Sequence, residues 1–191
     1  MDSQNYVSHG GMDGVKDKEA KEGGGGTSFF LLRVMALLLT LVAAIVLGVD
    51  KQNKVIPIKI VDSLPPLNIP VVAKWHYLSA FVFFVVSNAI ACTYAALSLL
   101  LSFNRKKSLV LVTLILDLLM VPLLFSGIGA TGAIGLMGYE GNSRLRWGKA
   151  CNVFGKFCDQ VAVAIVLSLL GSIAFILLVM LAALRLHNKS K

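Results

Sequence analysis

Residues 108–138 read SLVLVTLILDLLMVPLLFSGIGATGAIGLMG, and Asp117 is the one charged residue among them. An α-helix needs roughly 20 predominantly apolar residues to cross the hydrocarbon core of a bilayer, because each residue adds about 1.5 Å of rise. This block is long enough to do so. Comparable apolar blocks occupy residues 29–49, 75–103 and 159–184. The sequence therefore predicts an all-α membrane protein, built as a bundle of four transmembrane helices.

The composition agrees with this pattern. Of the 191 residues, 57% are hydrophobic and the mean hydropathy is +0.79, whereas soluble domains are usually about half apolar. Residues 1–28 are polar and hold the glycine run 23–26, so we expect a disordered tail there. Residues 29–185 then form the membrane domain, and residues 186–191 form a second short tail. Four of the five prolines fall in residues 50–74, which indicates an ordered or extended loop rather than a span.

Four spans place both tails on the same side of the bilayer. Ten of the 18 basic residues lie on the tail side and eight on the other, so the positive-inside rule favours cytoplasmic tails by a small margin. The compact basic turn Arg105-Lys106-Lys107 lies on the tail side and adds to this bias. No cleaved signal peptide is evident before the first apolar block. We therefore predict that both termini are cytoplasmic.

The net charge of +8 suggests an acidic partner. The basic residues sit beside the apolar blocks and no groove-reading module is visible, so the sequence favours contact with anionic membrane lipids and argues against nucleic-acid binding. Enzyme signatures such as His-Glu-x-x-His or Gly-x-Ser-x-Gly do not occur, and the three histidines are scattered. We expect no enzymatic activity, no catalytic residues, no metal and no cofactor.

Two charges lie well inside the apolar blocks, Arg33 in the first and Asp117 in the third. A charge at such depth costs at least a few kcal/mol unless it is paired or reaches the interface. Counted from the same face of the bilayer, Arg33 is about 7 Å deep and Asp117 about 13 Å, a difference that an arginine side chain can bridge. We hypothesise an ion pair between them. The alternatives are an Arg33 side chain that extends to the headgroups and a protonated, hydrogen-bonded Asp117.

Small residues recur at every fourth position in two of the blocks. The repeats are Ser87, Ala91 and Ala95 in the second block and Gly127, Thr131 and Gly135 in the third. This spacing lets membrane helices approach closely, and it is equally compatible with packing inside one chain and with contact between chains. Asn88, near the middle of the second block, is expected to hydrogen-bond across helices and to hold them together.

The loop from Tyr139 to Cys158 is the most distinctive segment outside the apolar blocks. Cys151 and Cys158 lie in it, which suggests one disulfide under oxidising conditions. Two free thiols are the alternative, because spacing alone does not fix the geometry. The aromatic residues of the loop are expected to lie against the membrane surface. The other notable loop residues are Gly141, Asn142, Trp147, Phe154 and Phe157.

With these features the sequence resembles the plant CASP-like family (Casparian strip membrane domain protein-like), which is related to MARVEL-type four-span proteins. The resemblance covers roughly residues 28–186. The features that carry it are Arg33, Asp117, the loop pattern Gly141-Asn142…Trp147…Cys151…Phe154…Phe157-Cys158, and the second-block stretch from Ala80 to Cys92. Residues 61–67, in the first outer loop, depart from the founding members, which favours the broader CASP-like group over a Casparian-strip role.

The resemblance implies a multi-pass plasma-membrane protein that self-associates, as homodimers and as heterodimers with related CASP-like proteins. It also implies a scaffold that organises membrane patches and recruits cell-wall-modifying enzymes, since the founding members gather wall-building enzymes. The residues themselves leave one alternative open. Intramembrane ionisable groups commonly mark transport pathways, so an oligomeric channel or transporter for a small solute or ion is the competing hypothesis.

Overall fold

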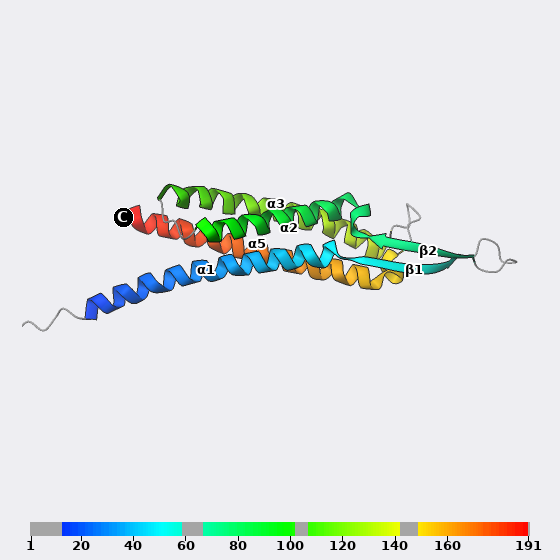
Figure 1. Ribbon diagram of the computed structural model, residues 1–191, viewed down its shortest axis with the longest axis horizontal. Coiled ribbons are helices and arrows are strands. Elements are labelled where there is room, and N and C mark those ends of the chain that lie inside the picture. Colours follow the sequence, from blue (N-terminus) through cyan, green and yellow to red (C-terminus); the bar gives the residue numbers. More distant parts are fainter. Residues whose placement is uncertain (1–12, 59–66, 102–106, 142–148, 191) are drawn as a thin grey trace, which may run out of the picture.

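The computed structural model describes residues 13–58, 67–101, 107–141 and 149–190, and four long helices dominate it (Figure 1). They are α1 (Asp13–Gly48), α2 (Ser79–Leu101), α3 (Lys107–Glu140) and α5 (Gly155–Ser190). Each contains an apolar segment long enough to cross a bilayer. These segments are Thr27–Gly48, Ser79–Leu101, Val110–Glu140 and Gly155–Asn188. The predicted helical bundle with four candidate spans is confirmed to this extent.

The four helices form a ring in which each packs against two neighbours. Both α1 and α3 pack against α2 and α5, so α1 and α3 lie diagonally across the bundle. Two clusters of buried apolar side chains fill the centre, one around Leu124 and Phe175 and the other around Phe84 and Phe157. The outward faces carry many exposed leucine, valine and isoleucine side chains. Such faces suit a lipid environment, because lipid tails are as apolar as these side chains.

Both ends of the described chain lie at the same end of the bundle. The beginning of α1 and the end of α5 are on the left of Figure 1, whereas the connection between α1 and α2 lies on the right. At the tail end, the Arg185 guanidinium of α5 stacks 4.2 Å from the centre of the Phe29 ring of α1. This cation–π contact fastens the first and last helices to each other.

The first helix is longer than the sequence suggested. Residues 13–28, which we expected to belong to a disordered tail, continue α1 back to Asp13. The stretch from Lys16 to Glu22 consists mainly of strong helix formers, and they extend the backbone hydrogen bonds of the adjoining span. Residues 1–12 lie outside the described part of the chain.

The ends of the other helices also differ from those predicted from the sequence. α2 begins at Ser79 rather than at residue 75, because Trp75–Tyr77 form a separate 3-10 turn, η1. α3 agrees with the predicted 108–138 to within two residues at each end. α5 begins before residue 159 and continues into the short C-terminal tail, since residues on both sides of the apolar block are compatible with the helix.

The segment between α1 and α2, expected to be an ordered or extended loop, contains a β-hairpin. β1 (Lys51–Ile58) pairs antiparallel with β2 (Leu67–Lys74), and the pair projects beyond the helix ends (Figure 1). Pro57 and Pro70 lie within the strands. A two-stranded ribbon tolerates them because each strand has one edge that needs no partner.

Asp50 connects α1 to the hairpin and is only 1% exposed. Its backbone N–H donates to the carbonyl oxygen of Leu47 at 3.1 Å, whereas neither carboxylate oxygen has a hydrogen-bond partner among the described residues. Burial raises the pKa of the Asp50 carboxyl to about 6, although the Lys156 ammonium opposes this rise. Burial therefore makes ionisation of Asp50 more costly in the folded protein than in the unfolded chain.

Asp50 should make the stability of the bundle depend on pH. Between a pH of about 4 and about 6 the native protein binds more protons at Asp50 than the unfolded chain does, so the free energy of unfolding falls as the pH rises, by up to about 3 kcal/mol. Asp50→Asn should remove this dependence and be the more stable protein at pH 7. Thermal unfolding in detergent micelles at several pH values measures the effect.

The matched control for this experiment is Asp159→Asn, because Asp159 is exposed. It should keep the pH dependence of the unsubstituted protein. Identical pH profiles for the unsubstituted protein and Asp50→Asn would contradict the assignment to Asp50.

Candidate functional site

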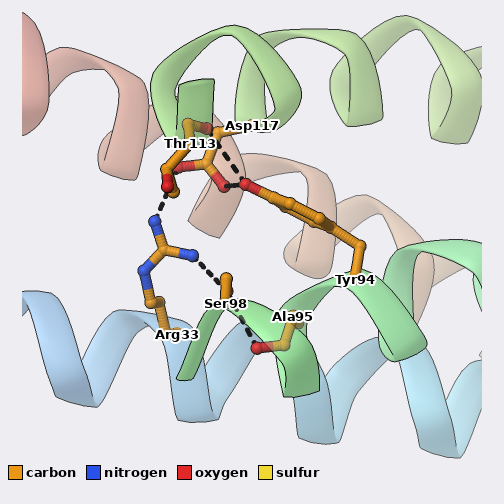
Figure 2. Close-up of polar contacts among 6 residues, drawn as sticks. All are labelled: Arg33, Tyr94, Ala95, Ser98, Thr113 and Asp117. Atoms are coloured by element: carbon orange, nitrogen blue, oxygen red, sulfur yellow. Dashed lines mark hydrogen bonds and ion pairs between the residues drawn. The ribbon is translucent and has the colours of Figure 1, made fainter. Parts of the chain in front are cut away.

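A buried ion pair joins the diagonal helices α1 and α3. Arg33 Nη2 lies 2.9 Å from Asp117 Oδ2, and the two residues are 6% and 1% exposed. Each comes from an apolar stretch in which a lone charge would be strongly unfavourable. The structure thus brings together the two charged residues that the sequence singled out, and Figure 2 shows their side chains meeting between the helices.

Two residues of α2 complete the network. The Tyr94 hydroxyl donates to Asp117 Oδ1 at 2.7 Å and also lies 3.0 Å from the carbonyl oxygen of Thr113. Arg33 Nη1 donates to Ser98 Oγ, which in turn donates to the carbonyl oxygen of its own helix one turn earlier. Three helices therefore contribute to one hydrogen-bonded cluster (Figure 2).

The contacts within this cluster fix the helices relative to one another. Its two formal charges cancel, and each carboxylate oxygen of Asp117 has a donor. A slip of one helix turn, about 5.4 Å, would separate the charges, so the pair fixes the vertical register of the helices. Elsewhere in the described part of the chain, no group of three or more His, Cys, Asp or Glu side chains could hold a metal ion.

Tyr94 and Ser98 are the members of the network that sequence reasoning missed. They are four residues apart, so they occupy one face of α2. The sequence does contain a sign of their role, because two hydroxyl groups four residues apart in an apolar block form a polar face on the helix. Spacing does not say which neighbouring helix the face meets, and this is why only the structure connects them to Asp117.

The small residues at every fourth position pack inside one chain. A Cβ atom at Gly127 of α3 would lie 2.7 Å from Ser87 Oγ of α2. Thr131 Oγ1 donates across the same contact to the carbonyl oxygen of Ala80 at 3.3 Å. At Gly135 the nearest atom to an added Cβ belongs instead to α5. These positions therefore hold α3 against both of its neighbours.

Asn88 is fully buried but does not bridge two helices. Its Nδ2 donates to the carbonyl oxygen of Phe84, one turn earlier in α2, at 3.0 Å. Its Oδ1 has no hydrogen-bond partner within the described residues. The expected cross-helix bond is thus replaced by a local one, because the carbonyl four residues back lies within reach of the side chain whatever the second helix does.

A disulfide and a hydrogen bond tie the hairpin end of the bundle together. Cys151 of α4 (Ala150–Val153) is bonded to Cys158 of α5, and their Cα atoms are 5.7 Å apart. The backbone N–H of Phe157 donates to Gln52 Oε1 of β1 at 3.0 Å. The hairpin, α4 and the first turn of α5 consequently form one connected unit.

The remaining loop residues have separate roles. Gly141 follows α3 with a φ of 71°, a left-handed conformation that favours glycine. Phe157 is buried in the core instead of lying on the membrane surface as expected, because α5 starts at Gly155 and directs it inward, and Phe154 is half-buried against the same cluster. Asn142 and Trp147 lie outside the described residues.

Comparisons with known proteins find relatives along the whole chain. The family model described as the Casparian strip membrane protein domain matches residues 22–174. CASP-like protein 1E1 of Ricinus communis is 65% identical over 192 residues, and CASP-like protein 1E1 of Populus trichocarpa is 62% identical over 193 residues, each covering 100% of both chains. CASP-like protein 1E1 of Arabidopsis thaliana is 52% identical over 92% of this chain and 95% of the relative. No solved structure matches this chain.

Breaking the ion pair should destabilise the bundle in a non-additive way. Asp117→Asn and Arg33→Met each leave one buried charge without its partner, and each should lower the free energy of unfolding by about 3 kcal/mol or more. The double variant should lose less than the sum of the two, because no lone charge remains. Unfolding by titrated SDS in mixed micelles measures this cycle, and strictly additive losses would argue against the pairing.

Gly127 should tolerate no side chain while Ser87 keeps its hydroxyl. Gly127→Ala places a Cβ against Ser87 Oγ and should cost about 1–3 kcal/mol, as overpacking usually does. Gly129→Ala on the same helix meets no atom within 4 Å and should be neutral. Adding Ser87→Ala to Gly127→Ala should restore most of the loss. Equal stability of the two glycine variants in SDS titration would exclude a tight α2–α3 contact.

Proposed function

We propose that this chain, which belongs to the CASP-like family of Casparian strip membrane domain proteins and to its 1E subgroup, is a self-associating scaffold of the plasma membrane. It is a multi-pass membrane protein with four candidate spans. Members of this family are not known as enzymes. A scaffold of this kind acts through the shape and lateral surface of its membrane domain.

The observation that supports the proposal is the closed network around Arg33 and Asp117. The Arg33 guanidinium lies 2.9 Å from one carboxylate oxygen of Asp117, and the Tyr94 hydroxyl of α2 lies 2.7 Å from the other. The polar groups inside the bundle thereby fix helix positions. A bundle with fixed helix faces offers a constant lateral surface, and packing of constant surfaces is what drives association of membrane helices.

We propose further that both termini are cytoplasmic. The tails share one end of the bundle, and the disulfide between Cys151 and Cys158 lies near the other end, beside the hairpin. Disulfides persist in oxidising, extracellular surroundings and are rare in the cytosol. The disulfide therefore supports the same orientation as the small excess of basic residues on the tail side.

The partners we propose follow from this orientation. Homodimers and heterodimers with related CASP-like proteins would form laterally, through the lipid-facing surfaces of the helices. Cell-wall-modifying enzymes would be recruited on the extracellular side, where the hairpin projects beyond the helix ends (Figure 1). The hairpin and the disulfide-linked segment provide a braced platform for such a contact.

The competing hypothesis is an oligomeric channel or transporter, and buried polar residues of the bundle are the observation in its favour. Thr40, Ser168 and Ser172 are fully buried near the bundle centre. However, the hydroxyls of Thr40 and Ser172 donate to carbonyl oxygens of their own helices at 2.8 and 2.9 Å, which leaves Ser168 Oγ as the one hydroxyl of the three without a hydrogen-bond partner among the described residues. A conduction route needs a series of polar groups that are free to exchange with an ion or solute, and one such hydroxyl among these three does not make a series, so the scaffold is the better supported function.

A photobleaching experiment in plant cells tests the scaffold. A fluorescent protein on the C-terminal tail should recover slowly and in patches, because neighbouring copies hold one another. Asp117→Asn should recover faster and uniformly, since an unpaired Arg33 disturbs the helix positions on which contact depends. Asp159→Asn, the same substitution at an exposed carboxylate, should behave like the unsubstituted protein.

Fast and uniform recovery of the unsubstituted protein would overturn the scaffold. A selective conductance in proteoliposomes of the purified protein would then favour the channel.

A further inference from the structure

A cavity of about 530 Å³ opens at the hairpin end of the bundle. Its walls come from the C-terminal part of α3, the first turns of α5, the start of α2, and α4. Both cysteines of the disulfide lie in its lining, so the covalent bond holds α4 in place as one wall. The volume falls within the range of about 300–1,000 Å³ typical of sites for small ligands.

The lining of the cavity combines exposed and buried side chains. Leu136 and Met137, at its mouth, are 58% and 47% exposed, whereas Phe81 and Val161, deeper inside, are buried. The lining extends to Ile165, ten residues into α5. The α5 part of the lining begins at Phe157, so it covers about 12 Å of helix, which is less than half of the roughly 30 Å hydrocarbon thickness of a bilayer.

One end of the cavity is positively charged. Lys74 is the only charged residue among the described residues that line it, and the rest of the lining is almost entirely apolar. The Lys74 ammonium lies 5.7 Å from the centre of the Tyr77 ring, and that ring is itself largely exposed. Tyrosine and tryptophan near the start of a span lie at the level of the lipid headgroups. The lysine is therefore placed where lipid phosphates lie.

We propose that this cavity binds one acyl chain of an anionic membrane phospholipid, with the lipid phosphate at the Lys74 ammonium. An apolar cavity beside one cation matches the two parts of such a lipid, a hydrocarbon tail and an anionic head. A tail that enters the cavity leaves hydrocarbon for an equally apolar lining, so the gain comes from van der Waals contacts that the unfilled space would lack. The lipid would complete the wall between α3 and α5 at the hairpin end.

Two glycines of α3 provide a matched pair of variants. Gly132 lines the cavity, Gly129 does not, and a Cβ atom at either position meets no atom within 4 Å. Gly132→Leu should fill the cavity without disturbing the helix contacts, whereas Gly129→Leu adds the same side chain elsewhere. Ala162→Phe on α5 fills the cavity from the opposite wall and serves if Gly132→Leu does not fold.

The probe is phosphatidylglycerol with a photoreactive diazirine on one acyl chain, mixed into proteoliposomes of the full-length protein. Illumination followed by peptide mass spectrometry should place the label on residues 132–139 and 158–165. Gly132→Leu and Ala162→Phe should lower this labelling roughly tenfold, as expected when an apolar site is closed. Gly129→Leu should leave it unchanged.

The headgroup contact has its own control in the hairpin. Lys51 lies opposite Lys74 in the strand register but does not line the cavity. Lys74→Gln should weaken labelling by phosphatidylglycerol roughly fivefold, the size expected of one partly exposed charge pair. Lys51→Gln should have no effect, and unlabelled phosphatidylglycerol should compete better than phosphatidylcholine.

Several outcomes would overturn the proposal. Labelling that is spread evenly over all helices, or that is equal in the two leucine variants, would remove the acyl-chain site. Equal effects of the two lysine variants, or equal competition by phosphatidylcholine, would remove the anionic headgroup. Loss of cross-linked dimers in Gly132→Leu, with lipid labelling unchanged, would assign the cavity to a second copy of the chain.

Discussion

The pairing of one positive and one negative charge inside an apolar bundle constrains the rest of the structure. Arg33 and Asp117 lie on helices that face each other diagonally, so their side chains meet in the interior of the bundle that α2 and α5 help to enclose. Tyr94 and Ser98 of α2 then satisfy the remaining polar groups. Because a lone buried charge is much more unfavourable than a lost apolar contact, this cluster sets the register to which the helix faces conform.

The two ends of the bundle are stabilised by different interactions. The Arg33–Asp117 network and the stacking of Arg185 on Phe29 stabilise the half of the bundle near the tails. At the other end, a disulfide and the hydrogen bond from Phe157 to Gln52 hold α4, α5 and the hairpin together. This division leaves the hairpin end covalently braced but incompletely packed, with an apolar cavity between its helices.

Much of the fold could be predicted because the apolar blocks are long and nearly free of charge, and the bilayer sets their length. The positions of Arg33 and Asp117 could be compared in depth for the same reason. Asn88 shows the limit of such reasoning. Its depth is evident from the sequence, but its hydrogen bond goes to its own helix. The two strands of the hairpin could not be predicted either, because proline is unfavourable in most strands and is tolerated mainly at unpaired edges.

The sequence by itself determined the number of candidate spans, the location of both tails at one end of the bundle and the two charges that need a partner, since hydrophobic length and the cost of a buried charge act locally along the chain. The tertiary structure decided which helices are neighbours, and with it the roles of Tyr94 and Ser98, the fit of Gly127 against Ser87, and the cavity at the hairpin end. These depend on how each helix is rotated about its axis. That rotation is set by packing with all neighbours at once, which no single segment encodes.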